Sequence, residues 1–303
     1  MTTPLIRRVA NWRLRSRTLE VGRRTLVMGV VNITPDSFSD GGSFLDPQAA
    51  VAHALNLLDE GADLLDLGAE STRPGARVSG AGVSPEVSSR EEMARLLPVL
   101  DGIFKARPGA IVSVDTYKAE TARAALAGGA EIINDVSGFC WDPDMAGVCA
   151  EAGCGVVLMH TRGRPDEWGA QTQLAPDELL EMVRAGLQTS LDKAAAAGIR
   201  AESIVLDPGY GFGKRGEENF ALLARQAELL GLGRPLLAGV SRKSFLGKAL
   251  AALYGGKTAP VEGREIASVA TMVAAILSGV SIVRVHRVRT AIEAALVADA
   301  VKN

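Results

Sequence analysis

The chain has 303 residues, of which 33 are Lys or Arg and 35 are Asp or Glu, so its formal net charge is −2. Proteins that bind nucleic acid through its phosphates normally carry a basic surplus, and this balance argues against that class. Hydrophobic residues make up 47% and charged residues 22%, which is typical of a globular domain and excludes a disordered chain.

The N-terminal segment differs in charge from the rest of the chain. Its first 24 residues contain seven arginines and one acid, Glu20, so they carry +6 and the remaining residues −8. Arg-rich, acid-poor starts are also typical of transit peptides. We favour a solvated basic leader with a short β-hairpin over residues 1–23, because residues 18–21 and 25–31 flank a turn that contains Gly22.

Eight short runs rich in Val, Ile and Leu recur along the chain and predict strands. Most are apolar nearly throughout, which is the pattern of parallel strands buried on both faces. They span residues 26–31, 63–67, 111–114, 131–136, 155–159, 204–206, 236–240 and 282–285.

Helical patterns separate these strands, most clearly over residues 46–60, 179–197 and 219–230. In the first, Asp46 is a candidate N-cap, Pro47 suits the first helical position and Gly61 suits the end. Strand followed by helix, eight times without a linker, predicts one domain over residues 24–303 with the α/β fold of a (β/α)8 TIM barrel. A doubly wound sheet is the alternative, since the sequence does not reveal strand order.

Two further features bear on cellular location. Three cysteines, Cys140, Cys149 and Cys154, without a secretory signal predict a reducing compartment, the cytoplasm, and we interpret them as buried small hydrophobes. Residues 266–283 carry no charge, yet Ser278 and Gly279 indicate the end of a helix within them. A buried helix followed by a buried strand therefore fits better than a membrane span.

Polar residues gather where the predicted strands end. In a barrel these ends meet at one mouth, where active sites lie. The residues that follow the eight strands in order begin with Asn32, Glu70, Asp115, Asn134, Met159 with His160, Asp207, Ser241 with Arg242 and Lys243, and Arg284 with His286.

Four of these residues, Asp115, Asn134, Asp207 and Lys243, come from different strands. Carboxylate, amide and ammonium groups together suit a flat heterocycle with an amino-amide edge, because a buried carboxylate accepts from adjacent N–H groups. The alternative is that Asp115 and Asn134 cap turns.

A second group of residues suits a phosphorylated ligand. Arg284 and His286 are two residues apart on a strand and so share a face, near the usual phosphate site of a barrel and beside Asn32 of the first strand. Mg²⁺ prefers oxygen ligands and substrate phosphates, so a magnesium ion fits this group.

The strand-end motifs, taken together, closely resemble those of the dihydropteroate synthases, which are pterin-binding TIM barrels. They occur in family order over roughly residues 25–290. The motifs are Asn32-Ile-Thr-Pro-Asp-Ser-Phe-Ser-Asp-Gly-Gly42, Glu70-Ser-Thr-Arg-Pro-Gly75, Ser113-Val-Asp-Thr116, Ile133-Asn-Asp-Val136, Asp207-Pro-Gly-Tyr-Gly-Phe-Gly213, Ser241-Arg-Lys-Ser-Phe245 and Arg284-Val-His286.

The resemblance implies a transferase of folate biosynthesis that joins 4-aminobenzoate to (7,8-dihydropterin-6-yl)methyl diphosphate and uses Mg²⁺. It also implies a homodimer that binds no nucleic acid or membrane and is a target of sulfonamides. It implies that Asn32 binds the diphosphate through magnesium, and that Lys243, Asp115, Asp207 and Arg73 are catalytic. The substrate-binding residues that it implies are Asp115, Asn134, Asp207 and Lys243 for the pterin, Arg284 and His286 for the diphosphate, and Thr72, Phe38, Asp40, Phe212 and Ser244 for the aminobenzoate. Met159 is a further predicted substrate-binding residue.

The sequence departs from the family pattern at Ala69, often Gly, at an extended segment over residues 78–89, and at Arg287, where an acid often follows the histidine. We interpret Arg287 as added positive charge near the diphosphate site. Two alternative functions remain: a pterin-dependent corrinoid methyltransferase, which would not need Arg284 and His286, and a catalytically silent pterin-binding barrel.

Overall fold

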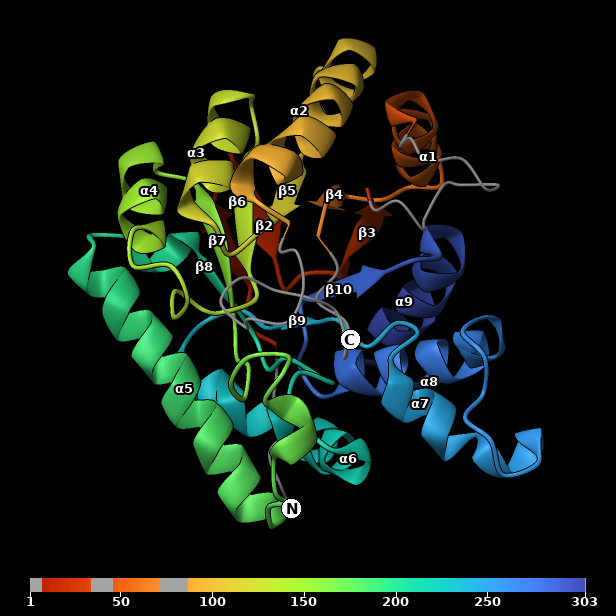
Figure 1. The fold of residues 1–303 in the computed structure, drawn as a ribbon. Helices are drawn as coiled ribbons and strands as arrows, with labels where there is room; N and C mark the ends of the chain where they lie inside the picture. Colours follow the sequence, from red (N-terminus) through yellow and green to blue (C-terminus); the bar gives the residue numbers. More distant parts are fainter. Residues whose placement is uncertain (1–6, 34–45, 71–86, 303) are drawn as a thin grey trace.

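The computed structural model describes residues 7–33, 46–70 and 87–302 of the chain. Eight parallel strands form one sheet in the order β8-β7-β6-β5-β4-β3-β10-β9. A parallel bridge between Leu206 and Leu236, with the Leu206 N–H donating to the Pro235 carbonyl at 3.0 Å, joins the two ends of the sheet into a ring. Figure 1 looks into this ring, with the helices arranged around it. The predicted (β/α)8 barrel is confirmed.

The strands of the barrel match the eight predicted runs. They are β3 (Leu26–Asn32), β4 (Leu64–Gly68), β5 (Val112–Asp115), β6 (Ile132–Asp135), β7 (Gly155–Met159), β8 (Ile204–Asp207), β9 (Leu237–Ala238) and β10 (Ile282–Val285). The largest difference is at β9, where the predicted run of residues 236–240 is longer than the paired strand. Leu236 and Val240 are buried all the same. The apolar run therefore predicts which residues are buried, and it does not predict how many of them pair with a neighbouring strand.

The helices that cover the barrel begin and end close to the predicted signals. In α1, the Asp46 carboxylate accepts from the Gln48 N–H at 2.9 Å and Pro47 is the first residue, as predicted. The α-helices are α1 (Pro47–Asp59), α2 (Ser89–Ala106), α3 (Ala119–Ala127), α4 (Met145–Ala152), α5 (Pro176–Ala196), α6 (Gly216–Arg225), α7 (Ser244–Ala249), α8 (Glu265–Leu277) and α9 (Val288–Lys302). Short 3₁₀ helices are η1 (Trp168–Ala170), η2 (Ala201–Ser203), η3 (Gln226–Leu232), η4 (Ala251–Tyr254) and η5 (Glu262–Arg264).

The N-terminal hairpin is present, but its pairing differs from the prediction. β2 (Thr18–Val21) pairs antiparallel with β1 (Ala10–Arg13) and not with residues 25–31. The reason is that β3 hydrogen-bonds to β4 on one side and to β10 on the other, so neither of its edges is left for β2.

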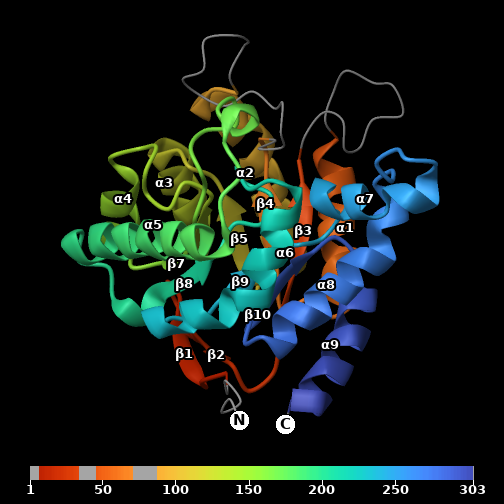
Figure 2. The ribbon, with the colours of Figure 1, turned by 90° about the horizontal axis from the view of Figure 1, so that it is seen from below.

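The hairpin packs against the base of the barrel, at the end opposite the carboxyl ends of the strands (Figure 2). Trp12, Leu14 and Val21 are at most 1% exposed and pack with inward-facing residues such as Met28 and Val157. The leader is therefore not solvated throughout, because these side chains fill the base of the barrel.

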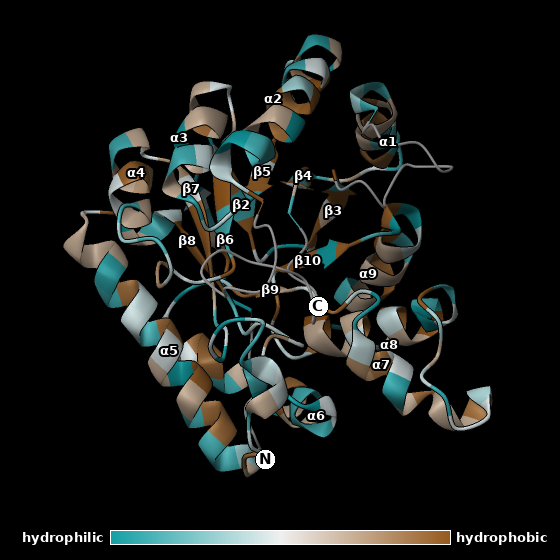
Figure 3. Ribbon diagram, in the orientation of Figure 1, coloured by the Kyte–Doolittle hydropathy of each residue, from teal (hydrophilic) through white to brown (hydrophobic). Residues whose placement is uncertain are grey.

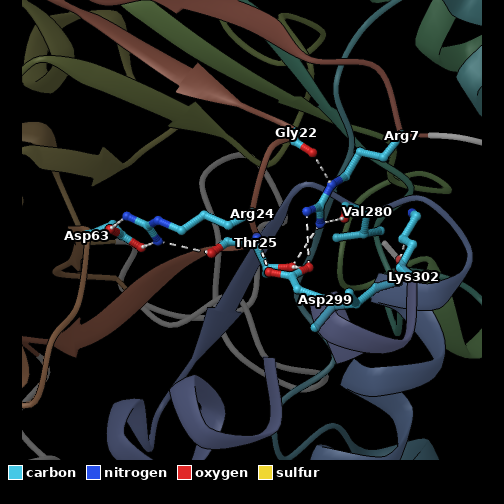
Figure 4. Close-up of polar contacts among 9 residues, drawn as sticks. Arg7, Gly22, Arg24, Thr25, Asp63, Val280, Asp299 and Lys302 are labelled. Carbon is cyan, nitrogen blue, oxygen red and sulfur yellow. Dashed lines mark hydrogen bonds and ion pairs between the residues drawn. The ribbon is translucent and has the colours of Figure 1, made fainter. Parts of the chain in front are cut away.

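A polar cluster ties the N-terminal segment to the last helix (Figure 4). The Arg7 guanidinium donates to the Asp299 carboxylate at 3.0 Å, to Thr25 Oγ1 at 2.8 Å and to the carbonyls of Gly22 and Val280 at 2.7 and 3.0 Å. The Arg7 side chain is only 3% exposed. This contact joins the two ends of the described chain beneath the barrel.

The core lies in two layers, inside the barrel and between the barrel and its helices. In Figure 3 the strands are mainly hydrophobic, while hydrophilic residues lie on the helices around them. Cys149 and Cys154 are buried as predicted, but Cys140 is exposed. The uncharged stretch at residues 266–283 forms α8 and the start of β10, also as predicted, although Ile266 is 86% exposed. No helix in the described parts of the chain has the length and apolar character needed to cross a membrane.

Candidate active site

Alternate residues of each strand face the barrel interior, because side chains of a strand have a period of two. Near the base these residues are apolar: Leu64, Ile132 and Val205 belong to one buried cluster. The next inward positions toward the carboxyl ends, two residues further along, are Asp66, Asn134 and Asp207. The interior thus changes from apolar to polar toward one mouth.

Asp66 lies at the centre of the polar layer. Its carboxylate is fully buried and accepts from Ser113 Oγ at 2.6 Å, Asn134 Nδ2 at 3.0 Å and Arg284 Nε at 2.5 Å. β4 adjoins neither β6 nor β10 in the sheet, so the contacts with Asn134 and Arg284 cross the interior. The carboxylate therefore fixes two predicted ligand-binding side chains.

Arg284 links Asp66 to Asp115. Its Nη2 donates to Asp115 Oδ2 at 2.9 Å, while Nη1 has no hydrogen-bond partner among the described residues. Burial raises the pKa of Asp115 to about 7, and the neighbouring Asp66 adds to this effect while Arg284 opposes it. Asp115 therefore changes charge near neutral pH, which makes it sensitive to whatever ligand faces it.

Asp207 lies near the same guanidinium, and Lys243 lies near Asp207. A Cβ atom at Gly239 would be 3.7 Å from Asp207 Oδ2 and 4.0 Å from Arg284 Cδ, so this glycine leaves room between them. Burial raises the pKa of Asp207, and the Gly209 N–H and Lys243 lower it. Lys243 Nζ lies 4.0 Å from the centre of the Phe212 ring, a cation–π distance.

Apolar side chains form one wall of the mouth. Met159 is buried with Tyr117 and Val136, and Trp141 and Phe212 pack against them. Met159 is opposite Asp207 in the register of β7 and β8. A flat ring bound by Asp207 thus has an apolar surface beside it.

The ends of β3 and β10 carry the predicted anion-binding residues. His286 follows β10, and its Nδ1 is 2.9 Å from Ser241 Oγ after β9. Asn32 is half-buried at the end of β3, opposite Gly68 in the register with β4. Arg287 points partly toward Glu265, with Nε 3.6 Å from Oε2, so its added charge is partly balanced.

Other predicted site residues are placed less directly. Ser244 is exposed at the first position of α7, directly after Lys243. Thr72, Arg73, Phe38 and Asp40 lie outside the described residues, and so does most of the extended segment at 78–89. The aminobenzoate part of the site therefore stays a prediction.

The sequence reasoning missed two polar residues of the site, Asp66 and Lys214. Asp66 sits inside an apolar run, and a charged residue at an inward position of a buried strand was the available signal. Lys214 is 6% exposed and donates to the carbonyls of Gly209, His160 and Phe212.

These features define the class of protein: a barrel whose mouth combines carboxylates and an amide for a flat heterocycle with cationic groups for an anion. The profile of the Pterin binding enzyme family matches residues 28–286. The dihydropteroate synthase of Mycobacterium leprae is 46% identical over 274 residues, covering 90% of this chain and 92% of that protein.

Solved structures that resemble this chain belong to the same family. A Xanthomonas albilineans dihydropteroate synthase with 4-aminobenzoic acid is 39% identical, with a TM-score of 0.83 over 97% of this chain and 99% of that one. A Yersinia pestis dihydropteroate synthase with a sulfonamide drug is 37% identical, with a TM-score of 0.84 over 96% and 98% of the two chains. The chain belongs to the dihydropteroate synthase family of pterin-binding enzymes, which are transferases.

Proposed function

We propose that this protein condenses (7,8-dihydropterin-6-yl)methyl diphosphate with 4-aminobenzoate, forming 7,8-dihydropteroate and diphosphate in folate biosynthesis. The observation that carries this proposal is the buried network of Asp66, Asp115, Asn134 and Arg284, with Asp207 and Lys243 beside it. It offers acceptors for the N–H groups of a pterin at the same mouth as cations for a diphosphate. We also assign the protein to the cytoplasm.

The chemistry follows from the charges at the mouth. The bond between the methylene carbon and the diphosphate oxygen breaks, and the oxygen keeps the electron pair. Arg284 and His286 neutralise the charge that develops on the diphosphate, which makes it a better leaving group. Asp115 and Asp207, when ionised, stabilise the cation left on the dihydropterin methylene.

The amine of 4-aminobenzoate then attacks the methylene carbon, forms the C–N bond and releases a proton. We propose this dissociative, SN1-like order, with no covalent intermediate on the enzyme. Exchange of oxygen positions in unreacted diphosphate substrate would support it, and an isotope-effect pattern of a strictly concerted displacement would contradict it.

A magnesium ion fits the diphosphate end of the site. The described residues include no group of three His, Cys, Asp or Glu side chains that would hold a metal alone. Asn32 offers one amide oxygen at the mouth, which suits an ion bound mainly by substrate phosphates and water. When bound, magnesium would neutralise negative charge on the diphosphate.

Removing the metal is expected to abolish most of the activity. In excess EDTA we expect product formation to fall at least tenfold, and added Mg²⁺ to restore it, because the leaving group then loses part of its charge neutralisation. Asn32→Ala should raise the Mg²⁺ concentration needed for half-maximal rate. Undiminished activity in EDTA would contradict a magnesium requirement.

The function is tested by assaying the purified protein with the dihydropterin diphosphate, 4-aminobenzoate and Mg²⁺ and detecting 7,8-dihydropteroate by mass spectrometry. Lys243→Ala should lower the rate at least 100-fold, while Lys248→Ala, an exposed lysine on α7, should not change it. Tight pterin binding without product would indicate a silent pterin-binding barrel instead.

We further propose that the protein is a homodimer through α8 and α9. These neighbouring helices (Figure 1) expose apolar side chains that monomers rarely expose together. The exposed fractions are 86% for Ile266, 44% for Leu277, 64% for Leu296, 67% for Val297 and 72% for Val301.

The double variant Ile266→Glu/Val297→Glu is expected to be monomeric, because the charges would be buried in such an interface. Light scattering after size-exclusion chromatography measures this. Leu253→Glu is the matched control, since Leu253 is 80% exposed on η4 and belongs to neither helix. A wild-type protein that elutes as a monomer at all concentrations would refute the dimer.

A further inference from the structure

The segment between β8 and α6 begins at Asp207 and closes around Lys214. Lys214 Nζ lies 2.8 Å from the carbonyl oxygen of Gly209 and 3.3 Å from those of His160 and Phe212. An ammonium group has three N–H donors, so three carbonyls satisfy all of them. The ammonium group therefore binds backbone carbonyls inside the protein and does not extend into solvent.

The path of this segment depends on glycine. Gly209 has φ +71° and Gly211 φ +84°, a region that other residues adopt at a cost. A Cβ atom at Gly209 would lie 1.9 Å from the His160 carbonyl oxygen. The backbone therefore passes close to the end of β7, and its carbonyls turn toward one point, where Lys214 Nζ lies.

The backbone that Lys214 holds carries two contacts of the active site. The Gly209 N–H donates to Asp207 Oδ1 at 2.7 Å, which orients that carboxylate. The Phe212 ring lies 4.0 Å from Lys243 Nζ, and Trp168 supports it edge-on with ring centres 5.3 Å apart. Fixing the carbonyls of Gly209 and Phe212 thus fixes the surroundings of Asp207 and Lys243.

We propose that Lys214 is a positioning residue for this reaction: its ammonium holds the carbonyls of Gly209, Phe212 and His160, and so places the Asp207 carboxylate for the pterin ring and the Phe212 ring against Lys243. The ligand named here rests on the proposed function. Lys214 itself touches no substrate, because its three donors are already used.

The position of Lys214 makes its effect depend on pH. Burial lowers its pKa to about 7, so the charge is present below that pH and lost above it. A neutral amine donates only two hydrogen bonds and attracts carbonyls less, so the segment is held less firmly at high pH. The groups that influence this titration are Asp207, Lys243, Glu218 and Arg162, and His160, whose own pKa burial lowers, lies beside it.

Lys214→Met tests the proposal, because methionine has a similar length but no donor. We expect the KM for both substrates to rise at least tenfold at pH 6 while kcat falls less than threefold. The reason is that the loosened segment binds the substrates less tightly in the ground state and in the transition state to a similar extent. The ratio of variant to wild-type KM should fall toward 3 at pH 9. Comparing the two proteins at each pH removes the contribution of Asp115, which titrates in the same range.

Lys248→Met is the matched control and should leave both KM values unchanged, because Lys248 is exposed on the neighbouring helix α7. If Lys214→Met does not unfold cooperatively, Lys214→Gln replaces it, with a smaller expected rise. Wild-type KM values in the variant at pH 6 would overturn the proposal. If the wild type binds pterin but forms no product, calorimetric titration with 7,8-dihydropteroate compares the affinities of wild type and Lys214→Met instead. The positioning role of Lys214 and the proposed reaction are thus tested separately.

Discussion

Replacing Arg284 with alanine is expected to lower kcat/KM for the dihydropterin diphosphate by about 10³-fold. Removing one donor to a developing anion costs about 10²–10³ in rate, and Arg284 also holds Asp66 and Asp115 in place. Steady-state kinetics with both substrates measures the effect. Arg287→Ala is the control, because its side chain is 62% exposed and faces Glu265, and we expect less than a threefold change.

Arg284→Ala should also destabilise the fold, by about 3–5 kcal/mol, since it leaves the buried Asp66 carboxylate without its cation. The double variant Asp66→Asn/Arg284→Met removes both charges. It should recover much of the free energy of unfolding while remaining inactive, which separates the chemical role of Arg284 from its structural one. Recovery of activity in the double variant would contradict a role for Arg284 in the reaction.

The second large effect is expected at the base of the barrel. Arg7→Met should lower the free energy of unfolding by about 3–5 kcal/mol, because Asp299 then loses the guanidinium that balances its buried charge. The Asp299 carboxylate would keep the Thr25 N–H and hydroxyl, at 2.6 and 2.8 Å. Urea unfolding followed by circular dichroism measures the change, and kcat should remain within about twofold because the mouth is at the opposite end.

Arg24→Ala is the matched control for this prediction. Arg24 pairs with Asp63 close to the same cluster (Figure 4), but its side chain is 58% exposed. An exposed ion pair contributes about 0–1 kcal/mol, so we expect a small loss. Equal losses in Arg7→Met and Arg24→Ala would mean that burial of the first pair adds nothing.

Two features made the barrel predictable: burial of each strand on both faces, and the regular succession of strand and helix along the chain. Runs such as residues 155–159 and 282–285 are apolar because both faces of a parallel strand are covered, and each became a strand with those bounds. Polar residues at the ends of these runs were assigned to one mouth, because parallel strands in a barrel all end at the same side. Asn134, Asp207 and Arg284 were predicted on that basis, and the structure places them within the polar layer.

Pairing between distant segments was not predictable in the same way. The pattern of residues 18–21 identified a strand, yet it did not reveal that β1 would be its partner. That choice depended on β3 being paired on both edges by β4 and β10. The apolar pattern likewise gave no sign that Trp12 and Leu14 would fill the base of the barrel.

By itself, the sequence determined the strand runs, the succession of strands and helices along the chain, and the chemical types of the side chains at the mouth. Local periodicity and composition carry that information. Only the tertiary structure decided that Asp66 binds Arg284 across the barrel and that Lys214 turns inward onto three carbonyls. Closure of the barrel brings together residues far apart in the chain, and burial then requires each charge to find a partner.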